Sequence, residues 1–120
     1  MLDIKDIVYN CGVDKEPAEK VILNIAKLDE FYDRRELVEI YNYLLANCNR
    51  PEVLSGVVKL SDKYRDDTTL PYLTDILLMK NYSGDEADNF INVRVLCAKA
   101  ISNYKDNSTV GALLYCLNNK

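Results

Sequence analysis

Apolar side chains recur at helical spacing along most of the chain. Residues 18–28 place them at i, i+3, i+4 and i+7, which is the pattern of a helix with one buried face. Similar stripes run through residues 2–11, 37–48, 53–60, 70–79, 90–103 and 106–117. No stretch alternates with period two for long enough to predict a strand. We therefore expect an all-α protein of seven helices joined by short turns.

Polar and turn-forming residues separate these stripes. Asp14 is placed to cap the second helix, with Pro17 in its first turn, and this helix should end near Tyr32. Residues 49–52 and 83–86 fit capping boxes, in which a polar side chain and a glutamate satisfy each other's backbone N–H groups. These signals set the expected helix starts.

The stripes repeat along the chain at fixed offsets. An offset of 32 residues places Val53 on Val21 and Tyr64 on Tyr32, and an offset of 40 places Tyr104 on Tyr64. The two offsets differ by about eight residues, which we assign to the polar segment at residues 81–89. Self-similarity of this kind predicts a repeat architecture made of helix pairs.

The pattern resembles HEAT-like repeats of the short kind known from phycobilin lyases. Residues 70–77 carry the proline and spaced leucines of that family's first helix, and residues 93–101 carry the Val-Arg and small residues of its second. The resemblance implies a single domain over residues 1–120: an α-solenoid of antiparallel helix pairs, with about three repeats and a half repeat. It also implies a module that binds other macromolecules, with the second helices on the concave side. Ile22 and Leu54 replace the family's arginine and Gly111 replaces its last proline, so of its Asp–Arg ladder only Arg94 remains.

Composition limits the classes of function. The 120 residues include 15 basic and 19 acidic ones, and the net charge of −4 disfavours binding to a phosphate backbone. There is no histidine, which removes the usual general base and the commonest metal ligand. No signal segment and no run of about 18 apolar residues is present, so we expect a cytoplasmic protein that needs no cofactor. The four cysteines should be reduced core residues: Cys11, Cys48, Cys97 and Cys116.

An acidic segment is the first candidate binding site. Residues 65–90 contain six acids and two bases and so account for the whole net charge. The spacing does not fit a calcium loop. One interpretation is a solvated insertion, and the other is a docking surface for a basic protein partner, which would use Asp66, Asp67, Tyr82, Asp85, Glu86 and Asp88.

Other polar and aromatic residues favour structural roles. Arg94 stands among apolar residues and should pair with an acid of the adjacent turn. Tyr32, Tyr64 and Tyr104 recur once per repeat and should pack at turns. The tyrosines outside the repeat are candidates for exposed interface residues: Tyr41, Tyr43, Tyr72 and Tyr82.

The last stripe predicts a covered end of the repeat stack. Residues 110–117 carry more apolar surface than one neighbouring layer is expected to bury. We expect either a second copy of the chain, as a homodimer through this helix, or a partner to cover it. The alternative is a wide stripe that is wholly buried between helices.

Three functions remain open. The first is a non-enzymatic module that binds a partner protein through its concave or acidic surface. The second is a small acidic immunity protein of a bacterium or phage, which blocks the basic active site of a cognate toxin. The third is a nucleic-acid-binding protein using lysines of the second helices, opposed by the net charge: Lys20, Lys27, Lys59, Lys63 and Lys99.

Overall fold

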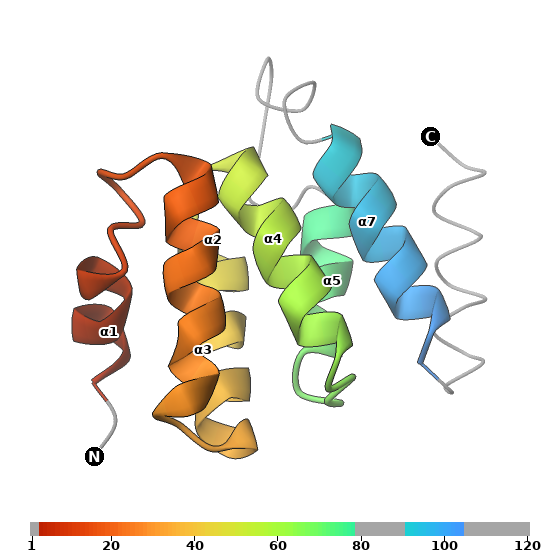
Figure 1. The fold of residues 1–120 in the computed structure, drawn as a ribbon. Helices are drawn as coiled ribbons and strands as arrows, with labels where there is room; N and C mark the ends of the chain where they lie inside the picture. Colours follow the sequence, from red (N-terminus) through yellow and green to blue (C-terminus); the bar gives the residue numbers. More distant parts are fainter. Residues whose placement is uncertain (1–2, 79–90, 105–120) are drawn as a thin grey trace.

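The computed structural model describes residues 3–78 and 91–104, and these residues form helices without any strand. Figure 1 shows the helices α1 (Ile4–Asn10), α2 (Ala18–Ala26), the 3-10 helix η1 (Lys27–Glu30), α3 (Arg34–Asn47), α4 (Pro51–Asp62), α5 (Leu70–Leu77) and α7 (Ile91–Ser102). The all-α class is confirmed for this part of the chain. The expected capping box at 83–86 and the expected helix at 106–117 lie outside the described residues.

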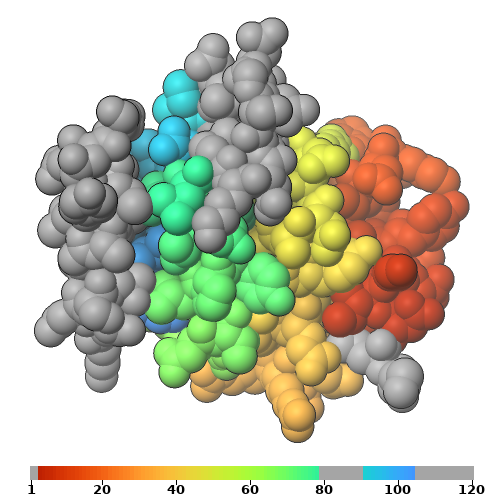
Figure 2. All heavy atoms as spheres, turned by 180° about the vertical axis from the view of Figure 1, so that it is seen from behind, coloured from red at the N-terminus to blue at the C-terminus, as the bar shows by residue number. Residues whose placement is uncertain are grey.

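The helices are arranged in two layers. In the front layer α2 packs on α4 and α4 packs on α7, and the three run in the same direction (Figure 1). In the back layer α1, α3 and α5 follow one another side by side, as Figure 2 shows from behind. Helices that are adjacent in the front layer are therefore those related by the sequence offsets of 32 and 40. The solenoid arrangement as such stays a prediction.

The core fills the space between the layers. Each stripe turns its apolar side chains inward, and the largest of these side chains are almost completely buried: Ile25, Leu37, Ile40, Leu44, Leu45, Leu54, Leu73, Ile76 and Ile101. Burial of this kind contributes about 1.5–3 kcal/mol for each large aliphatic side chain. The stripes read from the sequence thus mark the faces that hold the two layers together.

Within the front layer, α2 and α4 approach each other closely at one point. Gly56 of α4 faces Ile22 of α2, and a β-carbon at Gly56 would lie 2.5 Å from Cγ1 of Ile22. Only a residue without a side chain leaves room for Ile22 at this crossing. Gly56 therefore sets how closely α2 and α4 pack.

Two predicted caps are wrong. Pro17, not Asp14, is the N-cap of α2, and it makes no side-chain cap bond. At α4 the N-cap is Arg50, again without a side-chain cap bond, so the box expected at 49–52 is absent. Asn49 and Asp14 both lie ahead of the N-cap position, where a side chain does not reach the first free N–H groups. A box that was not predicted begins α3, where Asp33 and Glu36 cap each other's backbone N–H.

The second helix is shorter than expected. Its α-helical part ends at Ala26, and the 3-10 helix η1 continues to Glu30 before the chain turns at Tyr32. Tyr41 also differs from the prediction of an exposed interface residue, because its side chain is only 2% exposed. It lies on the buried stripe of α3 between Leu37 and Leu44, so the helical period decides its burial.

In the described ranges, no helix has the length and apolar character needed to cross a membrane.

Candidate functional site

The structure places the expected acidic residues only in part. Asp66 and Asp67 lie in the turn between α4 and α5. Tyr82, Asp85, Glu86 and Asp88 lie outside the described residues. The acidic surface as a whole therefore stays a prediction, and its described part is this one turn.

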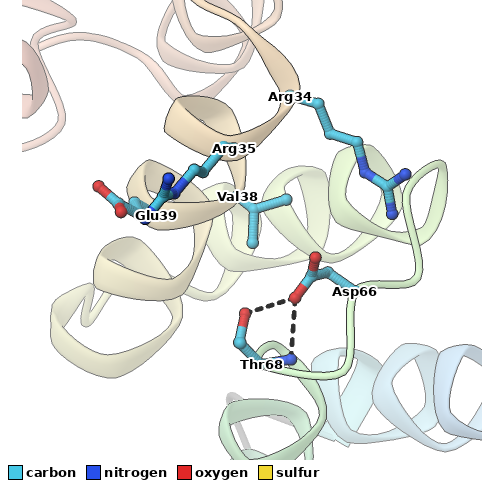
Figure 3. Close-up of a pocket in the computed structure, with 6 residues that line it drawn as sticks. All are labelled: Arg34, Arg35, Val38, Glu39, Asp66 and Thr68. Carbon is cyan, nitrogen blue, oxygen red and sulfur yellow. Dashed lines mark hydrogen bonds between the residues drawn. The ribbon is translucent and has the colours of Figure 1, made fainter.

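The carboxylate of Asp66 is engaged within its own turn. Its Oδ1 accepts hydrogen bonds from the backbone N–H of Thr68 at 2.9 Å and from the Thr68 hydroxyl at 2.6 Å (Figure 3). These two bonds hold the pKa of Asp66 below its ordinary value, and the charge of Arg34 adds to the effect. Asp66 is therefore ionised at neutral pH and is unsuited to act as a general base. Asp67 next to it is exposed.

Helix α3 and the residue that follows α7 are tied to the same turn. Asn42 of α3 donates to the Thr68 hydroxyl at 3.1 Å and accepts from the Thr69 hydroxyl at 2.7 Å. The Tyr104 hydroxyl, just after α7, donates to the Asp66 carbonyl at 3.1 Å. The turn is a structural junction, and Asp66 serves it as a turn residue.

A hollow of about 500 Å³ lies between this turn and the start of α3 (Figure 3). It is lined by Arg34, Arg35, Val38, Glu39, Asp66 and Thr68. Arg34 lies along one wall, where its Nη2 donates to the Tyr64 carbonyl at 3.2 Å and its guanidinium lies 5.8 Å from the Tyr64 ring centre. The hollow thus carries two positive and two negative side chains.

The chemistry of this hollow favours binding over catalysis. Its lining contains no thiol, and its hydroxyl, that of Thr68, is already bonded to Asp66 and Asn42. Activation of a hydroxyl nucleophile needs an adjacent base, and Asp66 is a weak one because its pKa is lowered. We therefore treat the hollow as a polar surface feature.

Arg94 makes a backbone contact. Its Nε donates to the carbonyl of Leu77 at the end of α5, at 2.9 Å. The ion pairs within 4.0 Å among the described residues are Lys20–Glu16 and Arg65–Asp62, so the carboxylate partner expected for Arg94 is not found among them. The bond links α7 to α5, and the structural role of Arg94 stays a prediction.

The described cysteines are buried. Cys11, Cys48 and Cys97 have free thiols, and burial raises the pKa of each, that of Cys97 to about 12. A thiol that keeps its proton is a poor nucleophile and a poor metal ligand. In the same residues no group of three potential metal-ligating side chains gathers. Cys116 lies outside the described residues.

The front face, which we define as the exposed positions of α2, η1, α4 and α7, shows a second arrangement. Residues related by the offsets of 32 and 40 form rows across the three parallel helices. One row is Leu23, Ser55 and Val95, in which Leu23 is 60% and Val95 is 49% exposed, whereas Ser55 is partly buried. The next row, one helical turn further on, consists of lysines only, and all are exposed: Lys27, Lys59 and Lys99.

Sequence reasoning counted these lysines but did not see the row. It named them together with Lys20 and Lys63 as candidates for binding nucleic acid, without aligning them by the repeat offsets. The signal was present, since Lys59 is 32 residues after Lys27 and Lys99 is 40 after Lys59. Those are the offsets that define the repeat, and they identify equivalent positions.

Comparisons provide no further guide to the site. Protein-family models, curated proteins and solved structures were compared with this chain, and none matches it.

Proposed function

We propose that this chain is a HEAT-like helical repeat module that binds a partner protein and catalyses no reaction. The observation that carries the proposal is the front face, where equivalent lysines of three parallel helices are exposed and the apolar side chains Leu23 and Val95 are exposed one turn before them. Single exposed apolar residues are common on protein surfaces, but these two lie beside equivalent lysines of the same three helices, which combines apolar and charged groups on one face.

The chemistry of the described side chains supports a binding role. The sequence has no histidine, and the three described thiols have raised pKa values. Asp66 has a lowered one. General acid–base catalysis near neutral pH needs a group with a pKa near 7, and each of these shifts moves the pKa further away from 7.

The front face is preferred over the acidic surface as the binding site. Of the two expected acids in the described turn, Asp66 is engaged by Thr68, and Asp67 is exposed. The alternative of an immunity protein that blocks a basic toxin rests on the acidic segment, and stays a prediction.

The experiment compares two single variants. Leu23→Asp and Tyr9→Asp each replace a side chain that is about equally exposed, 60% and 61%, by a carboxylate, but Tyr9 belongs to α1 in the back layer. Proteins retained from an extract of the producing cells by the wild type are identified and purified, and their dissociation constants are measured by titration calorimetry.

The expected result is a partner that Leu23→Asp binds at least about tenfold more weakly, which is the usual effect of losing an interface anchor. The Tyr9→Asp variant should bind like the wild type. Equal binding by all three proteins, or no partner at all, would contradict the proposal.

A further inference from the structure

The lysine row is uniform where the rest of the front face is mixed. Lys27 follows the first residue of α2 by nine positions, and Lys59 and Lys99 follow the first residues of α4 and α7 by eight. Each helix rises about 1.5 Å per residue, so the three lysines stand at nearly the same distance from the start of their helices. Because the three helices lie side by side and run in the same direction, the lysines occupy equivalent positions across the face (Figure 1).

The ammonium groups of this row are not engaged by the described part of the chain. The ion pairs found there are Lys20–Glu16 and Arg65–Asp62, and neither involves the row. Packed helices lie about 8–10 Å apart, so the helix axes that carry the three positive charges are spaced at about that distance. Like charges in a row repel one another, and a ligand of opposite charge relieves that repulsion.

The neighbouring rows define the side on which a ligand fits. One turn beyond the lysines lie Glu30 and Asp62, where Asp62 already pairs with Arg65 at 3.5 Å. One turn before them lie Leu23 and Val95. An acidic ligand along the row is repelled on the first side and meets apolar surface on the second.

We propose that the lysine row binds an extended acidic segment of the partner protein. The carboxylates of the segment lie on Lys27, Lys59 and Lys99, and its apolar side chains lie on Leu23 and Val95. A polyproline II segment advances about 9 Å per three residues and returns every third side chain to the same side. The segment therefore carries an acid at every third position, and it crosses the helices at a right angle. This inference rests on the proposed function and names the chemistry of its partner.

Net charge decides between an acidic peptide and a nucleic acid. Both carry negative charges, but the chain has a net charge of −4, and a long phosphate backbone would meet that field beyond the row. A short peptide touches only the row and its apolar neighbour. The peptide is therefore the better fit.

The test uses a labelled peptide of repeated Leu-Pro-Glu triplets, which holds glutamate and leucine on adjacent sides of a polyproline II helix. A scrambled peptide of the same composition is the control for spacing. Binding is measured by fluorescence anisotropy at low and at physiological salt. Exposed ion pairs are screened by salt, so the affinity should fall as salt rises.

Two triple variants separate the row from general charge. Lys27→Gln, Lys59→Gln and Lys99→Gln together remove the row. Lys5→Gln, Lys15→Gln and Arg35→Gln together remove the same charge from exposed positions away from the front face. The first variant should bind the triplet peptide about tenfold more weakly than the wild type, and the second should bind it no more weakly than about twofold. Circular dichroism checks that both variants keep their helices.

Each other outcome contradicts the inference. The acidic segment is excluded if the triplet peptide does not bind, if the scrambled peptide binds equally well, or if both triple variants bind alike. Tighter binding of an oligothymidine, lost with the row, would assign the row to nucleic acid. A protein partner that needs Leu23 but not the lysines would leave the proposed function standing and overturn this inference alone.

Discussion

Gly56 shows how a single residue fixes the spacing of the front layer. Alanine is intrinsically better than glycine in a helix by about 1 kcal/mol, so glycine here has a cost. The compensation is close packing, because the space for a β-carbon is already taken by Ile22. Ile22 is β-branched, and its first side-chain torsion has little freedom in a helix.

We expect Gly56→Ala to lower the free energy of unfolding by roughly 1 kcal/mol, because overpacking outweighs the gain in helix propensity. Urea unfolding measures this change. The effect should be relieved in the double variant with Ile22→Ala, which removes the obstructing atoms. A single variant more stable than the wild type would show that α2 and α4 are not in tight contact at Gly56.

Cys97 links the core to pH. Its side chain is 0% exposed, and burial raises its pKa from 9.0 to about 12. In the unfolded chain the thiol loses its proton near its ordinary pKa, whereas the folded protein keeps it. Between these two values the unfolded state binds fewer protons than the folded state, so the free energy of unfolding falls as the pH rises. The contribution of Cys97 to stability is therefore fully present only below about pH 9.

We predict that the free energy of unfolding decreases between pH 9 and pH 10 with a slope that Cys97→Ala reduces. One such group contributes up to about 1.4 kcal/mol per pH unit once the unfolded thiol is ionised. Tyr41 and Tyr104, whose pKa values burial raises to about 12, contribute only at higher pH. Identical slopes for the two proteins would show that Cys97 ionises equally in both states.

At the scale of single elements, the helix starts differ in how they are held. The N-cap of α3 is a reciprocal box, with Asp33 Oδ1 accepting from the Glu36 N–H at 2.9 Å and Glu36 Oε1 accepting from the Asp33 N–H at 3.2 Å. α2 and α4 begin without a side-chain cap bond. Proline stands at the N-cap or first position in both, where its fixed φ suits the turn.

Asp33→Ala should therefore lower stability by about 1 kcal/mol, the usual cost of losing an N-cap side chain. Asp14→Ala is a matched control, since Asp14 is an exposed aspartate ahead of α2 that caps nothing. It should change stability by less than about 0.5 kcal/mol. Thermal unfolding of both variants measures the difference, and equal effects would exclude the box as a source of stability.

The period of apolar residues predicted the helices well, because burial of a stripe is a property of many residues at once. The apolar stripe at residues 37–48 predicted the helix that the structure shows as α3, and the same stripe explains why Tyr41 is buried. Caps were predicted less well, since a cap depends on one residue standing at one position. Asn49 missed the N-cap of α4 by a single residue. The change to a 3-10 helix at Lys27 left no signal in the pattern.

The candidate site divides in the same way. The sequence showed that Asp66 is charged. It did not show that Thr68 would donate to the Asp66 carboxylate, because that hydrogen bond depends on the geometry of the turn. The lysine row was within reach, because equal offsets imply equal positions. What the sequence lacked was proof that α2, α4 and α7 run parallel and adjacent.

For the molecule as a whole, α4 is the central element and α1 the peripheral one. α4 packs on α2, α3 and α7, whereas α1 packs on α3 and has no fully buried residue of its own. The segment after α1 is fastened separately: Nη1 of Arg50 donates to the carbonyls of Val13 and Glu16, both at 2.7 Å.

We expect amide hydrogen exchange to be slowest in α4 and fastest in α1 among the described helices. Local opening is easiest where few apolar contacts are lost, so α1 should open without the rest of the protein. Native-state exchange followed by mass spectrometry measures both helices in one experiment. Protection of α1 equal to that of α4 would show instead that the protein opens as one unit.

The parallel front helices also bear on how such a chain can change in length. The step from Lys59 to Lys99 is eight residues longer than the step from Lys27 to Lys59, yet both pairs occupy equivalent positions. The additional residues must therefore belong to the return path between one front helix and the next. Evolution can lengthen or shorten that path while the front face keeps its register. An engineer adding a tag or a reporter sequence would have the same freedom there, with the front face left unaltered.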